Sequence, residues 1–487
     1  MNFGRVRGTR DLMGDEYYLQ RSVLQKLEQH FLSYGYQGVD LPILERTQTY
    51  LWKSGQSSRR KLFTLKAGDS PDPQEDLCLR PEITVSLLRA IQPLLPTALF
   101  PIRLAYQGPV FRNQGIAAHT DSQFTQAGVE LIGAGGAWAD AEIVQVAYRG
   151  LESLGLTDHR IVLGSLGTVI EMARRWIEER KLRDFLVENF SNLGKEVQSI
   201  AEIEQRLAEL GFSVNSALQS EASQEEQELA AILNRLGPEE GASLLAGLLK
   251  VLNLEVGPNR NFQDMMSRIV SKSNRNLQRD QLSKFLQAAT ELSTLHGPAY
   301  NTLSKLDDFI QRYGLSPEPL LELQQTLDLL IKSGIPQSQI SVDLGFGRGL
   351  HYYSGLIFEI QHRGRPLCGG GRYDGLSKIF GDPDPMSLVG FSYGIERVCE
   401  ALKEAGLPPQ SADLLNGASI DALVVPAAEE DYGSAIATAQ QLRAEGKRVE
   451  LVTGPLSEGE GLGVAKKRQA KQMVFIQGAS VHTQKMV

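Results

Sequence analysis

The sequence predicts an α+β fold, in which a sheet carries a helical insertion and is followed by a small C-terminal α/β domain. Two alternating apolar runs, 103–111 and 123–133, have the pattern of paired strands. Residues from about 170 to 310 are charged, have helical spacing and are poor in strand signals. Strands and helices then alternate over 419–487, which is typical of a small, mostly parallel α/β domain.

The composition is that of an ordinary globular protein with more than one domain. The chain has 487 residues, of which 42% are hydrophobic and 22% charged, so two or three domains are expected. A net charge of −8 argues against a broadly basic nucleic-acid-binding surface, although it leaves a local basic patch open.

The cysteines and the apolar runs exclude some classes of protein. Cys78, Cys368 and Cys399 are widely spaced and form no CxxC pair or Cys/His cluster, so we expect reduced core cysteines and no metal site. No run approaches the roughly 20 apolar residues that cross a bilayer, and the N-terminus has no apolar signal region. We therefore expect a cytoplasmic protein without a membrane partner.

The first half of the chain is predicted to alternate between helices and strands. Apolar spacing predicts a helix over 14–35 that ends at a glycine, and YQGVDLPILE reads as the strand that leaves it. Residues 77–93 predict a short strand, a turn at Pro81 and a helix. The ten residues between Arg112 and Gln123 are too many for a tight hairpin turn, so this loop is expected to project and to hold a ligand.

The second half contains three more segments of interest. Strand character returns at 338–364, and CGGGRYDGL at 368–376 reads as a glycine turn before a strand and helix that begin at 388. A linker rich in Pro, Gly, Ser and Asn is expected at 406–418, so the main domain is predicted to cover residues 1–405.

Three polar groups near the projecting loop are candidates for a site. Glu82, with Thr84, stands at a strand-to-helix turn, where a carboxylate can also serve simply as a helix cap. Arg112 ends a strand and can offer its fork of donors to a carboxylate or phosphate, or pair with an acidic surface neighbour. Gln126 and Glu130 are four apart, so they share one face of the sheet, which is suited to an ammonium or imidazole group or is merely solvated.

Two glycine-rich stretches complete the candidates. GFGRGLHYYSG carries Arg348, Tyr352 and Tyr353 but has neither the lysine of a P-loop nor GxGxxG spacing, so its glycines are expected to let strands pass close to a ligand. CGGGRYDGL carries Arg372, Tyr373 and Asp374, and GFSYGIER places Arg397 at a helix start; the three groups and two stretches together are candidates for one pocket.

Together these motifs resemble the class II aminoacyl-tRNA synthetases, and specifically the histidyl-tRNA synthetase family. The matching stretches, in chain order, are RGTRDL at 7–12, LRPEIT at 79–84, GPVFR at 108–112, QFTQAGVELIG at 123–133, RGLHYYSG at 348–355, CGGGRYDGL at 368–376 and GFSYGIER at 390–397. The resemblance implies an antiparallel sheet of six or seven strands flanked by helices, in a chain that is dimeric through its first motif.

The family has two functional branches. One is the ligase, which activates histidine with ATP and transfers it to tRNA; the other is the regulatory subunit of ATP phosphoribosyltransferase, which keeps the histidine pocket and acts with a short catalytic subunit. In both, the resemblance implies that histidine is bound by the set Glu82, Thr84, Arg112, Gln126, Glu130, Tyr352, Tyr353 and Tyr373. In a ligase, Arg112, Arg348 and Arg397 would be the catalytic residues, with the last two facing the α- and γ-phosphates.

The projecting loop departs from the ligase pattern, which is xERPQxGRxR after GPxFR. Here the ten residues are NQGIAAHTDS, so Gln114 replaces the glutamate that binds adenine, and the arginines are missing. Thr120 and Ser122 are uncharged, and Asp121 is expected to place a negative charge beside the phosphates. His351 also stands where the ligase has aspartate, as a local structural substitution or as a new functional group.

The tail, 419–487, resembles the first part of the ligase anticodon-binding domain, with the last strand and helix missing. Its AKKRQAK cluster leaves a residual tRNA contact open. The hypothesis is therefore a regulatory subunit without catalytic residues or cofactor, which partners a short-form ATP phosphoribosyltransferase catalytic subunit in a homodimer or larger hetero-oligomer. The alternative is a divergent histidine–tRNA ligase, which would need ATP, Mg²⁺ and tRNA.

Overall fold

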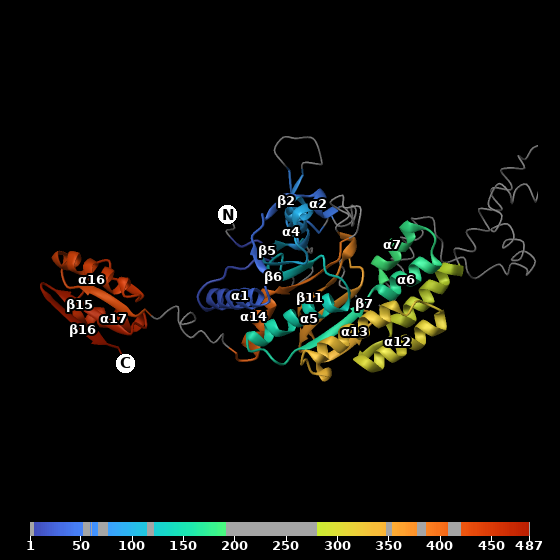
Figure 1. Ribbon diagram of the computed structural model, residues 1–487. Helices are drawn as coiled ribbons and strands as arrows, with labels where there is room; N and C mark the ends of the chain where they lie inside the picture. The colour runs from blue at the N-terminus through green and yellow to red at the C-terminus, as the bar shows by residue number, and fades with distance from the viewer. Residues whose placement is uncertain are drawn as a thin grey trace, which may run out of the picture.

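The computed structural model describes residues 4–51, 59, 61–66, 76–113, 121–190, 280–346, 353–376, 386–407 and 420–486. Within this part of the chain, the largest unit is a nine-stranded sheet with the order β1-β5-β6-β12-β11-β10-β7-β9-β8 (Figure 1). Its strands are β1 (Gln37–Val39), β5 (Ile102–Phe111), β6 (Gln123–Ile132), β7 (Arg160–Ser165), β8 (His296–Pro298), β9 (Ile340–Asp343), β10 (Leu356–His362), β11 (Arg365–Arg372) and β12 (Leu388–Gly394).

The middle of this sheet is antiparallel, as the sequence predicts, from β5 through β6, β12, β11 and β10 to β7. The described sheet is larger than the expected six or seven strands, and two of its pairs, β1 with β5 and β7 with β9, are parallel. Each parallel pair is joined by a long connection that contains helices, which is what parallel neighbours require.

Helices cover both faces of the sheet. On one face, α1 (Asp15–Ser33), α5 (Gly136–Ser153) and α14 (Ile395–Glu404) contribute to one apolar core with Ala105, Val129 and Phe391. On the other face, α4 (Thr84–Ile91) packs with Leu104 and Tyr106. Since neighbouring residues of a strand point to opposite faces, Glu130 lies on the α4 face.

The strand predicted for YQGVDLPILE is wrong as a single element. The chain forms β1, leaves the large sheet at Leu41 and Pro42, and then enters a second, three-stranded sheet with the order β2-β4-β3. The elements of this region are β2 (Leu44–Arg46), β3 (Thr64–Leu65), β4 (Leu77–Leu79), the short α2 (Gln48–Leu51) and, after α4, the 3-10 helix η2 (Gln92–Thr97). The strand–turn–helix predicted for 77–93 is confirmed as β4 and α4.

The glycine turn predicted at CGGG is also wrong, because Gly369, Gly370 and Gly371 lie inside β11. A side chain at Gly370 would meet the carbonyl of Gly390 in the neighbouring strand at 2.0 Å, so these glycines allow close strand packing and do not turn the chain.

The predicted insertion, about 170–310, is helical over most of the residues that the structure describes there. Its helices are α6 (Gly167–Trp176), α7 (Arg180–Glu188) and α12 (Ala299–Tyr313), followed by α13 (Glu318–Lys332) and the short η3 (Gln337–Gln339). Residues 191–279 lie outside the described part. The strand β8 falls within the predicted range yet pairs with β9 in the large sheet.

The C-terminal unit is a four-stranded sheet with the order β14-β13-β15-β16. The predicted parallel strands and helices are confirmed, and β16 adds an antiparallel edge. In the basic cluster, Arg468 pairs with Glu450 at 3.3 Å and Lys471 with Asp421 at 2.9 Å. The elements are β13 (Ala422–Pro426), η5 (Glu429–Asp431), α16 (Tyr432–Ala444), β14 (Val449–Leu451), α17 (Glu458–Lys467), β15 (Gln472–Gln477) and β16 (Ser480–Lys485).

All three cysteines are buried and free, in agreement with their expected role in the core. Among the residues described, no helix has the length and apolar character needed to cross a membrane.

A buried histidine makes the stability of the large domain depend on pH. His159 lies just before β7, is 1% exposed, and its ring centroid is 4.4 Å from that of Tyr148 on α5. Burial lowers the pKa of His159 to about 4, from an ordinary value of 6.5. The folded protein therefore keeps this imidazole neutral in mildly acidic solution.

Below pH 6.5 the unfolded chain binds a proton at His159 that the folded chain does not bind until about pH 4. This group should therefore lower the unfolding free energy by up to about 1.4 kcal/mol per pH unit across that window. We expect His159→Leu to remove this part of the pH dependence in urea unfolding curves recorded from pH 7 to pH 4. The same substitution at the exposed His296 should leave the dependence in place.

Candidate functional site

The candidate site centres on one buried carboxyl group, that of Glu130 in the middle of β6, which is 1% exposed. Its Oε1 atom accepts hydrogen bonds from Thr84 Oγ1 at 2.6 Å and from Tyr106 Oη at 3.1 Å. Its Oε2 atom accepts one from the hydroxyl of Tyr373. We call these four residues the Glu130 cluster; they come from α4, β5, β6 and the residue after β11.

The Glu130 carboxyl group keeps its proton to a higher pH than an ordinary carboxyl group does. Burial raises the pKa of Glu130 to about 8, and the hydroxyl groups of Thr84 and Tyr106 only partly oppose this, while the nearby charge of Glu82 adds to it. A protonated carboxyl group both donates and accepts hydrogen bonds. It can therefore meet a donor or an acceptor on a ligand.

The neighbouring strand makes room for this carboxyl group. Gly390 in β12 is paired directly with Glu130, and a Cβ atom at Gly390 would lie 1.7 Å from Glu130 Oε2. The carboxyl group thus lies over bare backbone, so glycine is required at position 390 for steric reasons alone.

Gln126 lies on the same strand face as Glu130, which confirms the prediction from their even spacing. Its Nε2 atom donates to Ser392 Oγ at 3.0 Å, and the side chain is 7% exposed. Within the part of the chain that the structure describes, the buried Gln126 Oε1 has no hydrogen-bond partner. A buried carbonyl oxygen without a partner is costly, and a ligand with an N–H group would satisfy it.

Glu82 and Thr84 lie at the start of α4, where the capping alternative for Glu82 is confirmed and its role in a ligand site stays a prediction. Its Oε1 atom accepts a hydrogen bond of 3.3 Å from the backbone N–H of Val85, which is a capping contact. The Glu82 carboxylate is nonetheless close enough to raise the pKa of Glu130. The Tyr50 hydroxyl donates to the Glu82 carbonyl at 3.1 Å and fixes this turn.

Arg112 is held at the end of β5 and close to the same turn. Its Nε donates to the carbonyl of Pro81 at 2.9 Å, and its guanidinium carbon lies 5.1 Å from the centre of the Phe124 ring. The ring of Tyr353 is 6.5 Å from that of Tyr373, edge to face. The structure thus places Arg112 and Tyr353, two candidates from the sequence, near the Glu130 cluster.

Arg397 is placed differently from the other candidates. It is exposed on α14, and its Nη1 atom donates to the carbonyl of Pro366 in β11 at 3.3 Å. Several sequence candidates lie outside the described residues, namely Arg348, His351, Tyr352, Gln114 and Thr120.

The N-terminal segment fastens one end of the projecting loop. The carbonyl of Gly8 accepts hydrogen bonds from the backbone N–H groups of Ser122 at 2.7 Å and Gln123 at 3.1 Å. Gly8 has a φ of +80°, and a Cβ atom there would lie 2.4 Å from Ser122 Oγ. Glycine is therefore needed at this position both for the backbone conformation and for the close approach.

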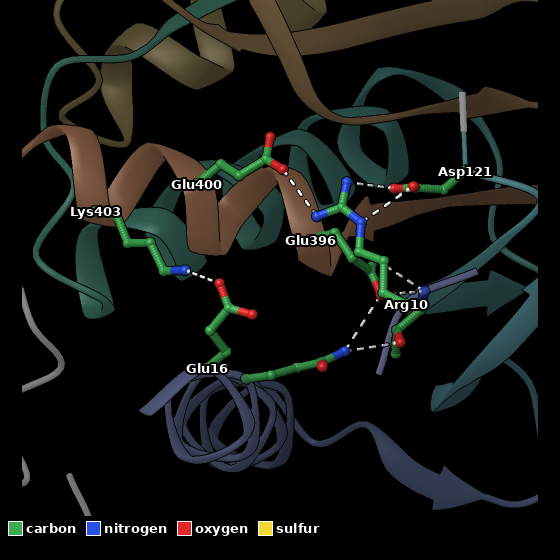
Figure 2. A network of polar contacts seen from close by, with 8 residues as sticks. Arg10, Glu16, Asp121, Glu396, Glu400 and Lys403 are labelled. Atoms are coloured by element: carbon green, nitrogen blue, oxygen red, sulfur yellow. Dashed lines mark hydrogen bonds and ion pairs between the residues drawn. The ribbon is translucent and has the colours of Figure 1, made fainter. Parts of the chain in front are cut away.

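Asp121 does not present a free negative charge, which corrects the expectation from the sequence. The Arg10 guanidinium donates to both of its carboxylate oxygens, at 3.1 and 2.8 Å, and to Glu400 Oε1 on α14 at 3.1 Å (Figure 2). In the same network Lys403 donates to Glu16 at 2.7 Å, so α14 is also joined to α1. The charge of Asp121 is used to hold the loop base against the N-terminal segment and α14.

Three contributors to the site escape a reading of the sequence. Tyr106 is an unremarkable aromatic residue in an alternating strand, although its even spacing from Leu104 places it on the α4 face. Ser392 and Gly390 belong to β12, 260 or more residues from Gln126 and Glu130 in the chain. Only the pairing of β6 with β12 brings them into the site.

Chemically, the arrangement is suited to a small polar ligand that carries N–H groups. It combines a neutral carboxyl group, three hydroxyl groups and an unsatisfied amide oxygen on one sheet face. Acceptor oxygen atoms of this kind can accept hydrogen bonds from an ammonium or imidazole group, so the binding of such a group stays a prediction from the spacing of Gln126 and Glu130.

The chain is similar to known proteins over most of its length. The model of the family described as histidyl-tRNA synthetase matches residues 8–254 and 241–398. The chain is 25% identical to the histidine–tRNA ligase of Methanocaldococcus jannaschii over 483 residues, which covers 97% of this chain and 92% of the ligase.

Solved structures share the fold. A protein from Bacillus halodurans, described as an ATP phosphoribosyltransferase regulatory subunit/histidyl-tRNA synthetase, superposes with a TM-score of 0.63 at 21% identity, covering 99% of this chain and 100% of the other. Histidyl-tRNA synthetase from Nostoc sp. superposes with a TM-score of 0.61 at 19% identity, covering 97% and 91%. These two likenesses establish the class II histidyl-tRNA synthetase-like fold.

The contact between β6 and β12 leads to a prediction about Gly390. Because the added methyl group of Gly390→Ala would overlap Glu130 Oε2 and the carbonyl of Val129, we expect a loss of about 1–3 kcal/mol in unfolding free energy, measured by urea denaturation. Gly38→Ala in β1, where a Cβ atom meets nothing within 4 Å, is the matched control. Equal stability of the two variants would contradict the close approach.

The raised pKa of Glu130 leads to a second prediction. The folded protein holds this proton up to about pH 8, whereas an ordinary carboxyl group loses it near 4.5. The stabilisation is therefore complete below pH 4.5 and is lost as the pH rises towards 8. Between pH 5 and pH 8, Glu130→Gln should make the urea unfolding midpoint depend less on pH than it does in wild type. Glu28→Gln, at an exposed position, should leave this pH dependence unchanged.

Proposed function

Because the chain belongs to the histidyl-tRNA synthetase family, we propose that it is a regulatory subunit of ATP phosphoribosyltransferase, which binds histidine and does not aminoacylate tRNA. The main observation in favour of the proposal is that several residues expected to bind histidine are in place, whereas the residues expected to bind ATP phosphates are missing from the loop. The Glu130 cluster is assembled, while the ten residues that join β5 to β6, 113–122, include no arginine or lysine to hold phosphates.

The assembled half of the site supports histidine binding. The neutral carboxyl group of Glu130 and the unsatisfied Oε1 of Gln126 lie on the same sheet face, at the positions that the family resemblance assigns to histidine. Both side chains are held in place, Glu130 by three hydroxyl groups and Gln126 by Ser392. Preorganised polar groups of this kind favour a small ligand with matching N–H groups.

The other half of the site supports the absence of adenylation. Residues 113–122, NQGIAAHTDS, contain no arginine or lysine. The one carboxylate of this loop, Asp121, is paired with Arg10, and Arg397 donates to the carbonyl of Pro366. Each charge-assisted contact to a phosphate is worth about 1.5–3 kcal/mol, so the loss of several would reduce the use of ATP by orders of magnitude.

The partner in this proposal is a short-form ATP phosphoribosyltransferase catalytic subunit, in a homodimeric or larger hetero-oligomeric assembly. The structural neighbour from Bacillus halodurans, an ATP phosphoribosyltransferase regulatory subunit/histidyl-tRNA synthetase, supports this choice. In this role the protein needs no cofactor of its own, and histidine is the ligand.

A second candidate function is a divergent histidine–tRNA ligase, which would use ATP and Mg²⁺ and bind tRNA. The observation in its favour is the extent of the sequence match, since the ligase of Methanocaldococcus jannaschii aligns over 97% of this chain, including most of the C-terminal unit. Arg112 at the end of β5 would then contact the reacting groups.

Two assays on the purified full-length chain separate these functions. We expect L-histidine to bind in equilibrium dialysis and Glu130→Gln to weaken that binding by about tenfold or more, because an amide, unlike the Glu130 carboxyl group, cannot ionise on binding to form a charge-assisted contact with the ligand ammonium group. We expect histidine-dependent ATP–pyrophosphate exchange to be at least about 1,000-fold slower than that of an ordinary ligase assayed in parallel, since about 4 kcal/mol of phosphate contacts is missing.

Exchange at ordinary ligase rates would overturn the regulatory proposal in favour of the ligase. If neither histidine binding nor exchange is found, both functions fail. The partner is tested separately, by adding the chain to a purified short-form catalytic subunit and measuring phosphoribosyl transfer with and without histidine. We expect the catalytic rate to depend on the chain, and no effect would exclude this partner.

A further inference from the structure

Three consecutive residues at the end of β11 connect the Glu130 cluster with the opposite face of the sheet. Tyr373 is 2% exposed and donates its hydroxyl hydrogen to Glu130 Oε2, on the α4 face. Its neighbours Arg372 and Asp374 contact each other, with Arg372 Nη1 donating to Asp374 Oδ1 at 3.2 Å. The middle residue of the triplet thus belongs to the cluster, and the outer two form an ion pair.

Arg372 is anchored to α5, which covers the other face. Its Nη2 atom donates to Asp140 Oδ1 at 2.6 Å and to the carbonyl of Gly136 at 3.2 Å. Arg372 and Asp140 are 6% and 4% exposed, so this is a buried ion pair. Burial, partly opposed by the Arg372 guanidinium, raises the pKa of Asp140 to about 6, and the charges of Glu322 on α13 and of Asp374 add to this rise.

The anchored side chain is coupled to the backbone on both sides of Tyr373. Asp374 Oδ1, which accepts from Arg372, also accepts a hydrogen bond of 2.9 Å from the N–H of Leu388. The N–H of Tyr373 donates to the Leu388 carbonyl at 2.8 Å, and the Arg372 carbonyl accepts from the N–H of Ser354 at 2.8 Å. The position of the Tyr373 backbone is thereby fixed to β12 and to the segment after Tyr353.

From this geometry we propose that Arg372 is a positioning residue for the candidate ligand site, and that its bridge from Asp140 to Asp374 holds the Tyr373 hydroxyl on Glu130. The planar guanidinium fork reaches two carboxylates and a carbonyl at once. A lysine ammonium is a point charge on a flexible stem and cannot make the same three contacts in a fixed geometry.

Energetic considerations also favour positioning over simple stabilisation. A buried ion pair gains little net free energy, because the two charges lose their hydration, but the loss of one partner leaves the other buried and uncompensated. Such pairs are suited to fixing one conformation. Here the conformation that is fixed contains the hydroxyl group that completes the Glu130 cluster.

A double-mutant cycle with Arg372→Lys and Tyr373→Phe tests the proposal. The first readout is the ionisation of Glu130, followed by the infrared C=O stretch of its protonated carboxyl group and assigned by its absence in Glu130→Gln. Titration from pH 7 to pH 10 keeps Asp140 ionised. Since a hydroxyl donor favours the ionised carboxylate, we expect each single variant to move the Glu130 midpoint to higher pH.

The second readout is the affinity for L-histidine, which rests on the proposed function. We expect each single variant to weaken binding by about tenfold, the equivalent of one charge-assisted hydrogen bond, and the double variant to be no weaker than Tyr373→Phe. Arg103→Lys is the control, because Arg103 forms a bidentate but more exposed pair with Glu142 on the same helix, at 2.8 and 2.9 Å. It should change neither readout.

Additive effects in the double variant would show that Arg372 acts independently of Tyr373 and would overturn the proposal. An unchanged Glu130 midpoint in Arg372→Lys would do the same. If that variant does not fold, Asp140→Asn serves in its place, because it removes one anchor and keeps the Arg372–Asp374 pair. If wild type does not bind histidine, the proposed function fails, and the infrared titration alone still decides whether Arg372 positions Tyr373.

Discussion

The burial of one carboxyl group, that of Glu130, is the constraint from which the rest of the site follows. A carboxyl group that is 1% exposed can be accommodated in two ways. It is either ionised and paired with a cation, or it keeps its proton and forms hydrogen bonds. This fold takes the second course, with hydroxyl groups from Thr84, Tyr106 and Tyr373. The hydroxyl groups come from the start of α4, from β5 and from the residue after β11. Gly390 in β12 leaves space for the carboxyl group, because it has no side chain.

Paired charges hold the base of the loop between β5 and β6. The carboxylate of Asp121 and the guanidinium of Arg10 satisfy each other, and Glu400 joins them from α14. These groups are between 26% and 45% exposed at their side chains, so the pairs contribute modestly to stability. Their structural effect is to fix the base of the projecting loop to the N-terminal segment.

Local patterns predicted a large share of the fold, because apolar periodicity reports directly which face of a helix or strand is buried. The even spacing of Gln126 and Glu130 was sufficient to place both on one face, as the structure confirms. The strand in YQGVDLPILE was predicted without its break, since the second sheet to which Leu44 belongs is assembled with residues that lie 20 to 35 positions further along the chain than Leu44.

The remaining features of the site depend on contacts between distant parts of the chain. The run CGGG has the composition of a turn, and only its position between β10 and β12 makes it a strand. Asp121 was expected to repel phosphates because Arg10, its partner, lies 111 positions away in the sequence. Tyr106 and Asp140 likewise carry no local signal, and their roles follow from the pairing of β5 with β6 and from the packing of α5 on the sheet.

The central claim, that a protonated Glu130 receives the ligand, is tested most directly by the protons exchanged when L-histidine binds. Calorimetric titrations at pH 7 in two buffers of different ionisation enthalpy give that number. Because a ligand ammonium group favours the ionised carboxylate, we predict the release of about one proton per histidine bound by the wild-type chain and none by Glu130→Gln. Binding with the same proton exchange in both proteins, or with none in either, would contradict the account.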